Sequence, residues 1–250
     1  MCRRGHKGLT ILRSYVYAHR GLHSSGIPEN SLAAFRKAKD AGYGIELDVH
    51  LLADGSLAVM HDSALQRTTG KNGFMEDLRK QDLSNYQLEG TEEMIPMLSD
   101  VLDLYQGVAP LIVELKCCRN NYVQLCTAAT TLLDSYSGPY CMESFDPRCI
   151  YWLRKNRPDI IRGQLTENYF RSAGCNLPMI LRFILRHQML NFLTLPDFVA
   201  YRYADRKTFS NILVRKLWGA TGVSWTLKTP EEYQTATNEH WIPIFENITP

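Results

Sequence analysis

Acidic side chains interrupt two apolar stretches of the sequence that otherwise read as buried strands. Glu46 and Asp48 stand two residues apart in GIELDV, so on a strand both carboxylates point to the same face. Glu114 holds a similar place in LIVELK, with Lys116 two residues further on and on the same side. Neighbouring carboxylates repel one another unless a cation neutralises them, and oxygen ligands suit Mg²⁺ or Ca²⁺. The spacing favours a divalent metal site at Glu46, Asp48 and Glu114 over the alternative of ordinary surface charges.

A histidine and an arginine end another short apolar run, VYAHRG. His19 closes this run, and a right-handed crossover would make its strand the neighbour of the strand that carries Glu46. Arg20 and Lys116 add positive charge for an anionic substrate, because a guanidinium can hold two phosphate oxygens at once. This strand end therefore predicts a site that handles phosphate.

A second histidine follows a hairpin signal in LDVHLLADGSLAVMHD. Asp54-Gly55 favours a two-residue turn, and if Ala53 pairs with Ser56, then Asp48 lies opposite His61. A lone histidine is more often a structural hydrogen-bonding residue, but this register favours a catalytic role for His61. Two imidazoles beside a metal site would supply an acid and a base that titrate near neutrality.

Short segments rich in Val, Ile and Leu alternate with amphipathic stretches of helical length, a pattern typical of a parallel sheet in an α/β protein. The expected strands are 16–19, 44–49, 111–116, 140–144, 160–165, 197–201, 222–226 and 243–247. Eight strands at this length predict a (β/α)8 TIM-type barrel, with an open doubly wound sheet as the alternative. We expect one barrel domain over 1–250, with a small insertion after the second strand at about 50–93 and a helix at 96–105.

Composition narrows the class of protein. The chain has 250 residues, a formal net charge of +2 and no basic stripe, which argues against nucleic acid as a partner. Seven cysteines, two of them adjacent at Cys117 and Cys118, form a poor disulfide framework and no paired zinc motif. The basic N-terminus lacks an apolar run of signal-peptide length. We expect reduced thiols and a cytoplasmic protein.

The segment 177–193 is apolar but carries Arg182, Arg186 and His187, and it is too short and too charged to span a membrane. The pattern favours a barrel helix that packs its apolar face on the strands. The alternative is a surface helix that meets lipid or a long-chain substrate, and hence peripheral membrane contact. For Trp225 two interpretations are equally open, one in which it lines the pocket and one in which it fills the barrel top.

Further short motifs accompany these candidates in a fixed order. They are His19-Arg20-Gly21, Pro28-Glu29-Asn30, Ala34-Phe35, Glu46-Leu47-Asp48-Val49, Asp54-Gly55, His61-Asp62, Arg67-Thr68-Thr69, Glu114-Leu115-Lys116, Ser144-Phe145 and Trp225-Thr226. From about Tyr17 to the last strand, this ordered set resembles the glycerophosphodiester phosphodiesterase family. Leu52 departs from the family's usual Thr, and Phe245-Glu246-Asn247 departs from its usual Ile-Thr-Asp-like ending. We expect neither departure to touch a catalytic position.

The resemblance implies a barrel enzyme that hydrolyses glycerophosphodiesters to glycerol 3-phosphate and an alcohol. It implies a divalent cation, Mg²⁺ or Ca²⁺, at Glu46, Asp48 and Glu114, and an acid/base pair at His19 and His61. It also implies phosphate contacts from Arg20 and Lys116, with Glu29 and Asn30 at the same site. The alternatives are an enzyme like phospholipase D or phosphatidylinositol-specific phospholipase C that acts on lipids, and a non-catalytic phosphate-binding barrel.

Overall fold

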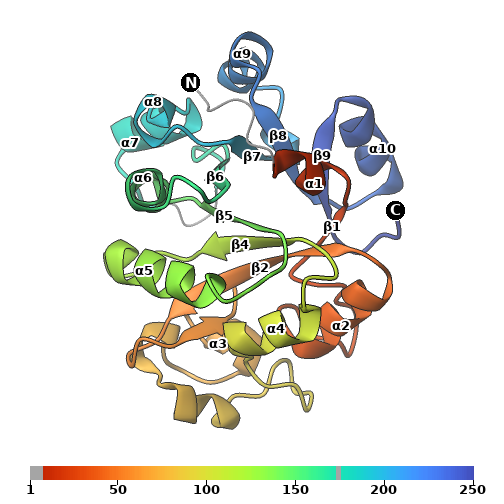
Figure 1. Cartoon of the computed structure of the whole chain (residues 1–250), viewed down its shortest axis with the longest axis vertical. Helices are drawn as coiled ribbons and strands as arrows, with labels where there is room; N and C mark the ends of the chain where they lie inside the picture. Colours follow the sequence, from red (N-terminus) through yellow and green to blue (C-terminus); the bar gives the residue numbers. More distant parts are fainter. Residues whose placement is uncertain (1–7, 173–175) are drawn as a thin grey trace.

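The computed structural model describes residues 8–172 and 176–250, and its strands close into a barrel surrounded by helices (Figure 1). The parallel strands are β1 (Tyr17–His19), β2 (Gly44–Leu51), β4 (Leu111–Leu115), β5 (Tyr140–Ser144), β6 (Arg162–Thr166), β7 (Phe198–Arg202), β8 (Thr221–Leu227) and β9 (Trp241–Phe245). β1 pairs with both β2 and β9, so the sheet has no open edge there. The predicted (β/α)8 barrel is confirmed, and the open sheet is wrong.

Helices cover the outside of the barrel between successive strands. They are α2 (Leu32–Asp40), α4 (Leu98–Tyr105), α5 (Tyr122–Leu133), α6 (Pro147–Asn156), α7 (Met179–Arg186), α8 (Asn191–Thr194), α9 (Phe209–Trp218) and α10 (Pro230–Asn238). The short helix α1 (Leu9–Arg13) precedes β1, and its Leu9 and Leu12 pack on the apolar residues inside the barrel. In α2, Ser31 caps the N-terminus by accepting a hydrogen bond from the Ala34 amide, and Ala34, Phe35 and Ala38 are buried. Residues spaced in this way form one apolar face, so α2 packs against the sheet.

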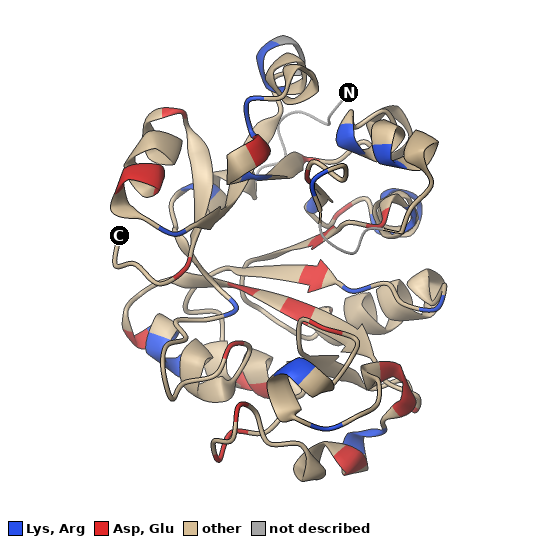
Figure 2. Cartoon of the chain, turned by 180° about the vertical axis from the view of Figure 1, so that it is seen from behind, with Lys and Arg blue, Asp and Glu red and all other residues tan. Residues whose placement is uncertain are grey.

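Alternation along β2 separates the core from the site. Ile45, Leu47 and Val49 belong to the large cluster between strands and helices. Glu46 and Asp48 therefore point to the other face, into the barrel. Inside the barrel a second cluster lies below the acids; its members include Tyr17, Ile112, Cys141, Phe198 and Ile244. Figure 2 shows the acidic positions that interrupt the central strands.

The hairpin after β2 differs from the predicted register. Leu51 lies opposite Leu57 of β3 (Leu57–Val59), and the Leu52 amide donates to the Ser56 carbonyl. The loop thus has three residues, with Gly55 at φ +83°, where a two-residue turn was predicted. One extra loop residue shifts the pairing, so the Met60 amide donates to the Asp48 carbonyl and Met60, not His61, faces Asp48. The predicted pairing of Asp48 with His61 is wrong.

The rest of the 50–93 region consists of short elements packed on this hairpin. They are α3 (Gln66–Thr69), η1 (Met75–Asp77) and η2 (Lys80–Asn85). Leu52, Met60, Leu65, Met75 and Leu83 belong to a separate apolar cluster beneath them. These side chains give the segment its own small core beside β2.

α7 also differs from the favoured expectation. None of its residues is buried, whereas α6 buries Cys149, Ile150 and Leu153. The prediction that the apolar face of the 177–193 segment packs on the strands is therefore wrong for α7. Within residues 8–172 and 176–250, we find no helix whose length and apolar character would let it cross a membrane.

Gly163 of β6 lies close against the neighbouring strand inside the barrel. A Cβ atom at this position would lie 2.1 Å from the ring of Phe198 on β7. The absence of a side chain is therefore what lets these two strands pair with Phe198 pointing inward.

We predict that Gly163→Val lowers the free energy of unfolding by about 1–3 kcal/mol, because the added methyl groups overpack the barrel interior. Urea unfolding followed by circular dichroism measures this change. The control is Gly55→Asn, at a loop position with open space around it and a positive φ that Asn tolerates, which should change stability by less than about 0.5 kcal/mol. Equal stability of Gly163→Val and the wild type would contradict the prediction.

Candidate active site

Three carboxylates meet at the C-terminal end of the barrel. β2 supplies Glu46 and Asp48, and its parallel neighbour β4 supplies Glu114, which lies beside Asp48 in the strand register. One oxygen from each of these side chains lies within 4.8 Å of the others, and all three residues are buried. The structure thus brings together the three predicted metal ligands.

Cationic and amide groups offset the repulsion among these acids. The Lys116 Nζ lies 2.8 Å from Asp48 Oδ1 and 2.7 Å from Glu114 Oε1. Arg20 Nε lies 3.4 Å from Asp48 Oδ2, and the Arg20 amide donates to Glu46 Oε2 at 3.2 Å. The charge is unevenly balanced, because both side-chain cations contact Asp48.

The pKa values follow this imbalance. Burial raises the pKa of Glu46 well above its usual value, and the nearby charges of Asp48 and Glu114 raise it further. Burial acts in the same sense on Asp48, but Lys116, His61 and Arg20 outweigh it and hold the pKa of Asp48 well below its usual value. All three donor groups are hard oxygens, the type that Mg²⁺ and Ca²⁺ bind, so the donor set fits a hard divalent cation.

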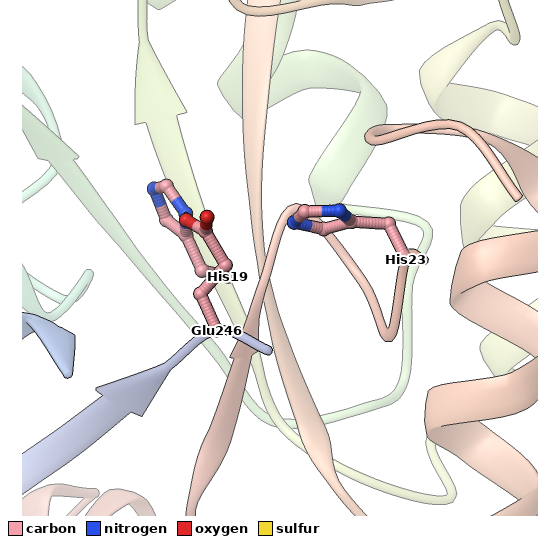
Figure 3. A group of neighbouring side chains, drawn as sticks. All are labelled: His19, His23 and Glu246. Atoms are coloured by element: carbon pink, nitrogen blue, oxygen red, sulfur yellow. The ribbon is translucent and has the colours of Figure 1, made fainter. Parts of the chain in front are cut away.

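His19 stands at the end of β1, beside Glu46 in the parallel register. Its Nδ1 lies 2.7 Å from Glu246 Oε2, so the ring can donate to this carboxylate while Nε2 faces the acids, 3.9 Å from Glu46 Oε2. Burial lowers the pKa of His19 to about 4, although the hydrogen bond to Glu246 opposes this shift. Figure 3 shows Glu246 reaching His19 from the end of β9, with His23 nearby.

Glu246 is a site residue that the sequence analysis missed. Burial would raise its pKa, but hydrogen bonds from His19 and Lys228 lower the pKa to about 2, so Glu246 is a carboxylate at neutral pH. Glu246 belongs to the departure at Phe245-Glu246-Asn247, and through it the closing strand contacts a catalytic candidate, His19. The position of Glu246 directly after the apolar strand β9 was the available signal.

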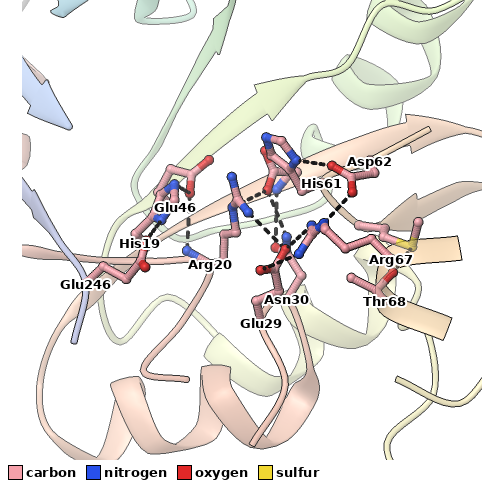
Figure 4. Close-up of polar contacts among 12 residues, drawn as sticks. His19, Arg20, Glu29, Asn30, Glu46, His61, Asp62, Arg67, Thr68 and Glu246 are labelled. Atoms are coloured by element: carbon pink, nitrogen blue, oxygen red, sulfur yellow. Dashed lines mark hydrogen bonds and ion pairs between the residues drawn. The ribbon is translucent and has the colours of Figure 1, made fainter. Parts of the chain in front are cut away.

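His61 reaches the same pocket through the loop after β3. Its Nδ1 lies 2.6 Å from Asp62 Oδ1, and Arg67 bonds Asp62 from the other side. Arg67 also donates to both oxygens of Glu29, and Glu29 accepts from Arg20 at 2.9 Å. Figure 4 shows this chain of charged contacts, which links the two halves of the site.

Glu29 and Asn30 bond other site residues rather than line the main pocket. Asn30 Nδ2 donates to Asp48 Oδ2 at 2.8 Å, and its Oδ1 accepts from the Asp48 amide at 3.4 Å. Glu29 holds Arg20 and Arg67, as described above, and lines a smaller neighbouring cavity. These bonds orient Asp48 and Arg20, and direct contact of Glu29 or Asn30 with substrate remains a prediction.

His50 is a second residue that the sequence analysis missed, although it stands two residues after Asp48 on the same face of β2. It is 1% exposed; its Nδ1 lies 2.7 Å from Glu76 Oε1, and its Nε2 lies 3.2 Å from the His61 carbonyl. Ser63 donates to the other oxygen of Glu76. Because the hairpin register does not place His61, this buried network is what anchors its backbone.

The candidate residues surround one pocket of about 510 Å³. Its lining includes His19, Arg20, Glu46, His61, Glu114, Lys116 and Trp225. Trp225 thus lines the pocket, where its ring packs edge-on against Phe145 at 5.6 Å. Glu143 of β5 also lines the pocket, and burial together with Glu114 raises its pKa well above the usual value. The sequence signal for Glu143, an acid in a strand, is the one that identified Glu114.

The chain is similar in sequence to known proteins. Residues 19–172 match the sequence model of the Glycerophosphoryl diester phosphodiesterase family. A glycerophosphodiester phosphodiesterase of Caldanaerobacter subterraneus subsp. tengcongensis is 39% identical over 100 residues, which cover 37% of this chain and 41% of that protein. YhdW of Bacillus subtilis is 34% identical over 171 residues, which cover 65% of this chain and 70% of that protein.

Solved structures show the same fold. One is a phosphodiesterase from Oleispira antarctica in complex with the product sn-glycerol-3-phosphate, with a TM-score of 0.76 and 22% identity. The similarity covers 93% of this chain and 92% of that one. By contrast, the sequence match spans less than half the length of the Caldanaerobacter relative.

We predict that His50→Ala lowers the free energy of unfolding by about 2–4 kcal/mol, because it leaves the buried Glu76 carboxylate without its main partner. Burial raises the pKa of Glu76, but His50 and Ser63 lower it to about 2 from an ordinary 4.5. The pair thus stabilises the fold above about pH 4.5, and this contribution falls as the pH drops toward 2. The stability difference between wild type and variant should shrink from roughly pH 6 to pH 3.

Chemical denaturation at several pH values measures this difference. His50→Gln, which keeps one amide donor, should fall between wild type and His50→Ala. A difference that stays constant with pH would show that the pair does not act through the charge of Glu76.

Proposed function

The chain belongs to the glycerophosphoryl diester phosphodiesterase family, and from this membership we propose that it hydrolyses glycerophosphodiesters to glycerol 3-phosphate and an alcohol. One observation carries the proposal: two histidines and two cationic side chains line a single pocket together with two members of a cluster of three buried carboxylates. The names of the relatives support the same substrate class.

Glu46, Asp48 and Glu114 would hold a divalent cation, Mg²⁺ or Ca²⁺. When bound, such a cation neutralises phosphate charge and lowers the pKa of an attacking hydroxyl. The high pKa of Glu46 supports this role, because burial and the charges of Asp48 and Glu114 disfavour its ionised form and a bound cation would favour it. Lys116 and Arg20 both contact Asp48, and Lys116 also contacts Glu114, so the deficit of positive charge falls mainly on Glu46.

His19 and His61 would transfer the protons. One imidazole accepts the proton of the attacking hydroxyl, and the other donates a proton to the departing alkoxide. The lowered pKa of His19 keeps its ring neutral at pH 7, the form that accepts a proton, and Glu246 fixes the Nδ1 proton so that Nε2 faces the pocket. This favours His19 as the base and His61, beside Asp62, as the acid.

Arg20 and Lys116 would bind the phosphate. Both line the pocket, and Glu29 anchors one end of the Arg20 guanidinium, which reduces its freedom before substrate binds. Trp225 offers an apolar wall for the glycerol carbons. Glu29 and Asn30 would act mainly by orienting Arg20 and Asp48.

We predict that His19→Ala and His61→Ala each lower kcat by about 10²- to 10⁴-fold, since each removes one proton-transfer step. The assay offers the purified protein a panel of water-soluble glycerophosphodiesters and follows glycerol 3-phosphate release. His240→Asn, an exposed position with positive φ, serves as the matched histidine control and should keep full activity. Undiminished turnover by His61→Ala would remove that residue from the mechanism.

We further predict that Mg²⁺ or Ca²⁺ raises the thermal midpoint of the wild type, because a ligand that binds only the folded state stabilises it. Glu46→Gln and Glu114→Gln should abolish this rise. Glu143→Gln, a buried acid outside the cluster, should keep it. EDTA should abolish both the rise and glycerol 3-phosphate release. A metal response that survives both Glu46→Gln and Glu114→Gln would contradict the assignment.

A further inference from the structure

The α7 segment exposes apolar side chains that the core leaves uncovered. Met179 is 75% exposed, Ile180 68% and Phe183 47%. The chain after α7 adds more exposed apolar residues, namely Met189, Phe192 and Leu193. Clusters of this kind on a protein surface mark contact with a partner or a membrane. We call these six residues the α7 surface.

The charged side chains of the α7 segment itself are of one sign. Residues 177–193 contain Arg182, Arg186 and His187 but no acidic residue. In Figure 2 the α7 ribbon carries basic bands only. Arg186 lies over the ring of Phe170, itself 41% exposed, with the guanidinium carbon 5.7 Å from the ring centre. Apolar side chains bordered by arginines match an anionic lipid surface, whose acyl region lies beneath negatively charged headgroups.

The opposite face of α7 faces the active site. Leu181 and Leu185 are four residues apart, so they share one side of the helix, and Leu177 lies just before the helix begins. They line a cavity of about 710 Å³ whose far end reaches His61, Glu114 and Lys116. Its remaining walls include Phe145, Tyr169, Asp146 and Arg148. Leu177, Phe145 and Tyr169 line both this cavity and the pocket of the two histidines, so the two spaces adjoin.

We propose that the α7 surface binds anionic membranes and that the cavity behind α7 takes the apolar chain of a phosphodiester lipid. The inference rests on the proposed function and names a substrate class for it: lysophospholipids presented at a lipid surface. Water adds across the same P–O bond as in a water-soluble diester. The oxygen of the water bonds to phosphorus and stays there as a hydroxyl, the ester P–O bond breaks, and the departing alkoxide takes the second proton of the water.

A second copy of this chain is the other occupant that an apolar surface invites. The adjoining cavity favours lipid, because a protein partner would need no apolar space beside the catalytic groups. The absence of acidic side chains from 177–193 also favours lipid, since two copies that meet through the same segment would bring like charges together.

The membrane contact is tested by sedimentation with vesicles of phosphatidylcholine alone and of phosphatidylcholine mixed with phosphatidylglycerol. The protein carries His61→Ala, so that hydrolysis does not alter the vesicles. We expect binding to the mixed vesicles, and a loss of at least about tenfold in affinity when Ile180→Ser and Phe183→Ser are added. The matched control adds Ile11→Ser and Val108→Ser, which are also exposed apolar residues but lie far from α7 in the chain. It should bind like its parent.

The outcomes separate the two proposals. Failure of the parent to bind, or equal binding by the Ile180→Ser, Phe183→Ser protein, overturns the membrane contact whatever the protein hydrolyses. A dimer in analytical ultracentrifugation that these substitutions dissociate, without vesicle binding, assigns the surface to a second copy and also overturns it. Absence of any diester hydrolysis by the wild type overturns the proposed function but leaves the vesicle result standing.

The substrate class is tested with the catalytically intact chain. Ile180→Ser with Phe183→Ser should lower kcat/KM for lysophosphatidylcholine in mixed vesicles by about tenfold and leave glycerophosphocholine hydrolysis within about twofold of wild type. Equal losses for both substrates would overturn the inference. A wild type that hydrolyses glycerophosphocholine but not the lysophospholipid would overturn it as well.

Discussion

The mutual repulsion of three buried carboxylates is the constraint around which the site is arranged. Glu46, Asp48 and Glu114 lie close together with little water to screen them, so each charged form destabilises the others. The chain offsets this only in part: Lys116 and Arg20 balance Asp48, whereas Glu46 receives one peptide N–H. The site therefore has a deficit of positive charge that a cation would fill. A barrel suits such a cluster, because parallel strands end at one face and bring their terminal side chains together.

Each histidine of the site depends on an acid, in one case from a distant segment and in the other from the next residue in the chain. Glu246 from the end of β9 holds His19, and Asp62 from the loop after β3 holds His61. Arg67 and Glu29 then connect Asp62 to Arg20, so the two halves of the pocket share one network of ion pairs. These hydrogen bonds and ion pairs hold the side chains that face the pocket. Substrate binding therefore has fewer side-chain rotamers to restrict.

Sequence reasoning worked where a local rule decides the geometry. The period of two along a strand places Glu46 beside Asp48 and Lys116 beside Glu114, and the crossover rule makes β1 and β2 neighbours. Sequence reasoning failed where the geometry depends on one extra loop residue or on a partner that is distant in the sequence. A third loop residue shifted the hairpin, so His61 reaches the site through the His50 network and not through strand pairing. Glu246 lies 227 residues from His19, and no local pattern connects them.

Helix periodicity has a related limit, which α7 illustrates. Apolar spacing identifies a face but not what covers that face, and in 177–193 the apolar residues outnumber the positions that one buried face can hold. The structure divides them: Leu177, Leu181 and Leu185 line a cavity, while Met179, Ile180 and Phe183 face outward. The strand ends of a barrel carry the chemistry, and the segments that follow them vary what is bound. A helix with two apolar faces beside the histidines is therefore where selection among phosphodiesters would be decided, because it borders the space that an alcohol or acyl group must enter.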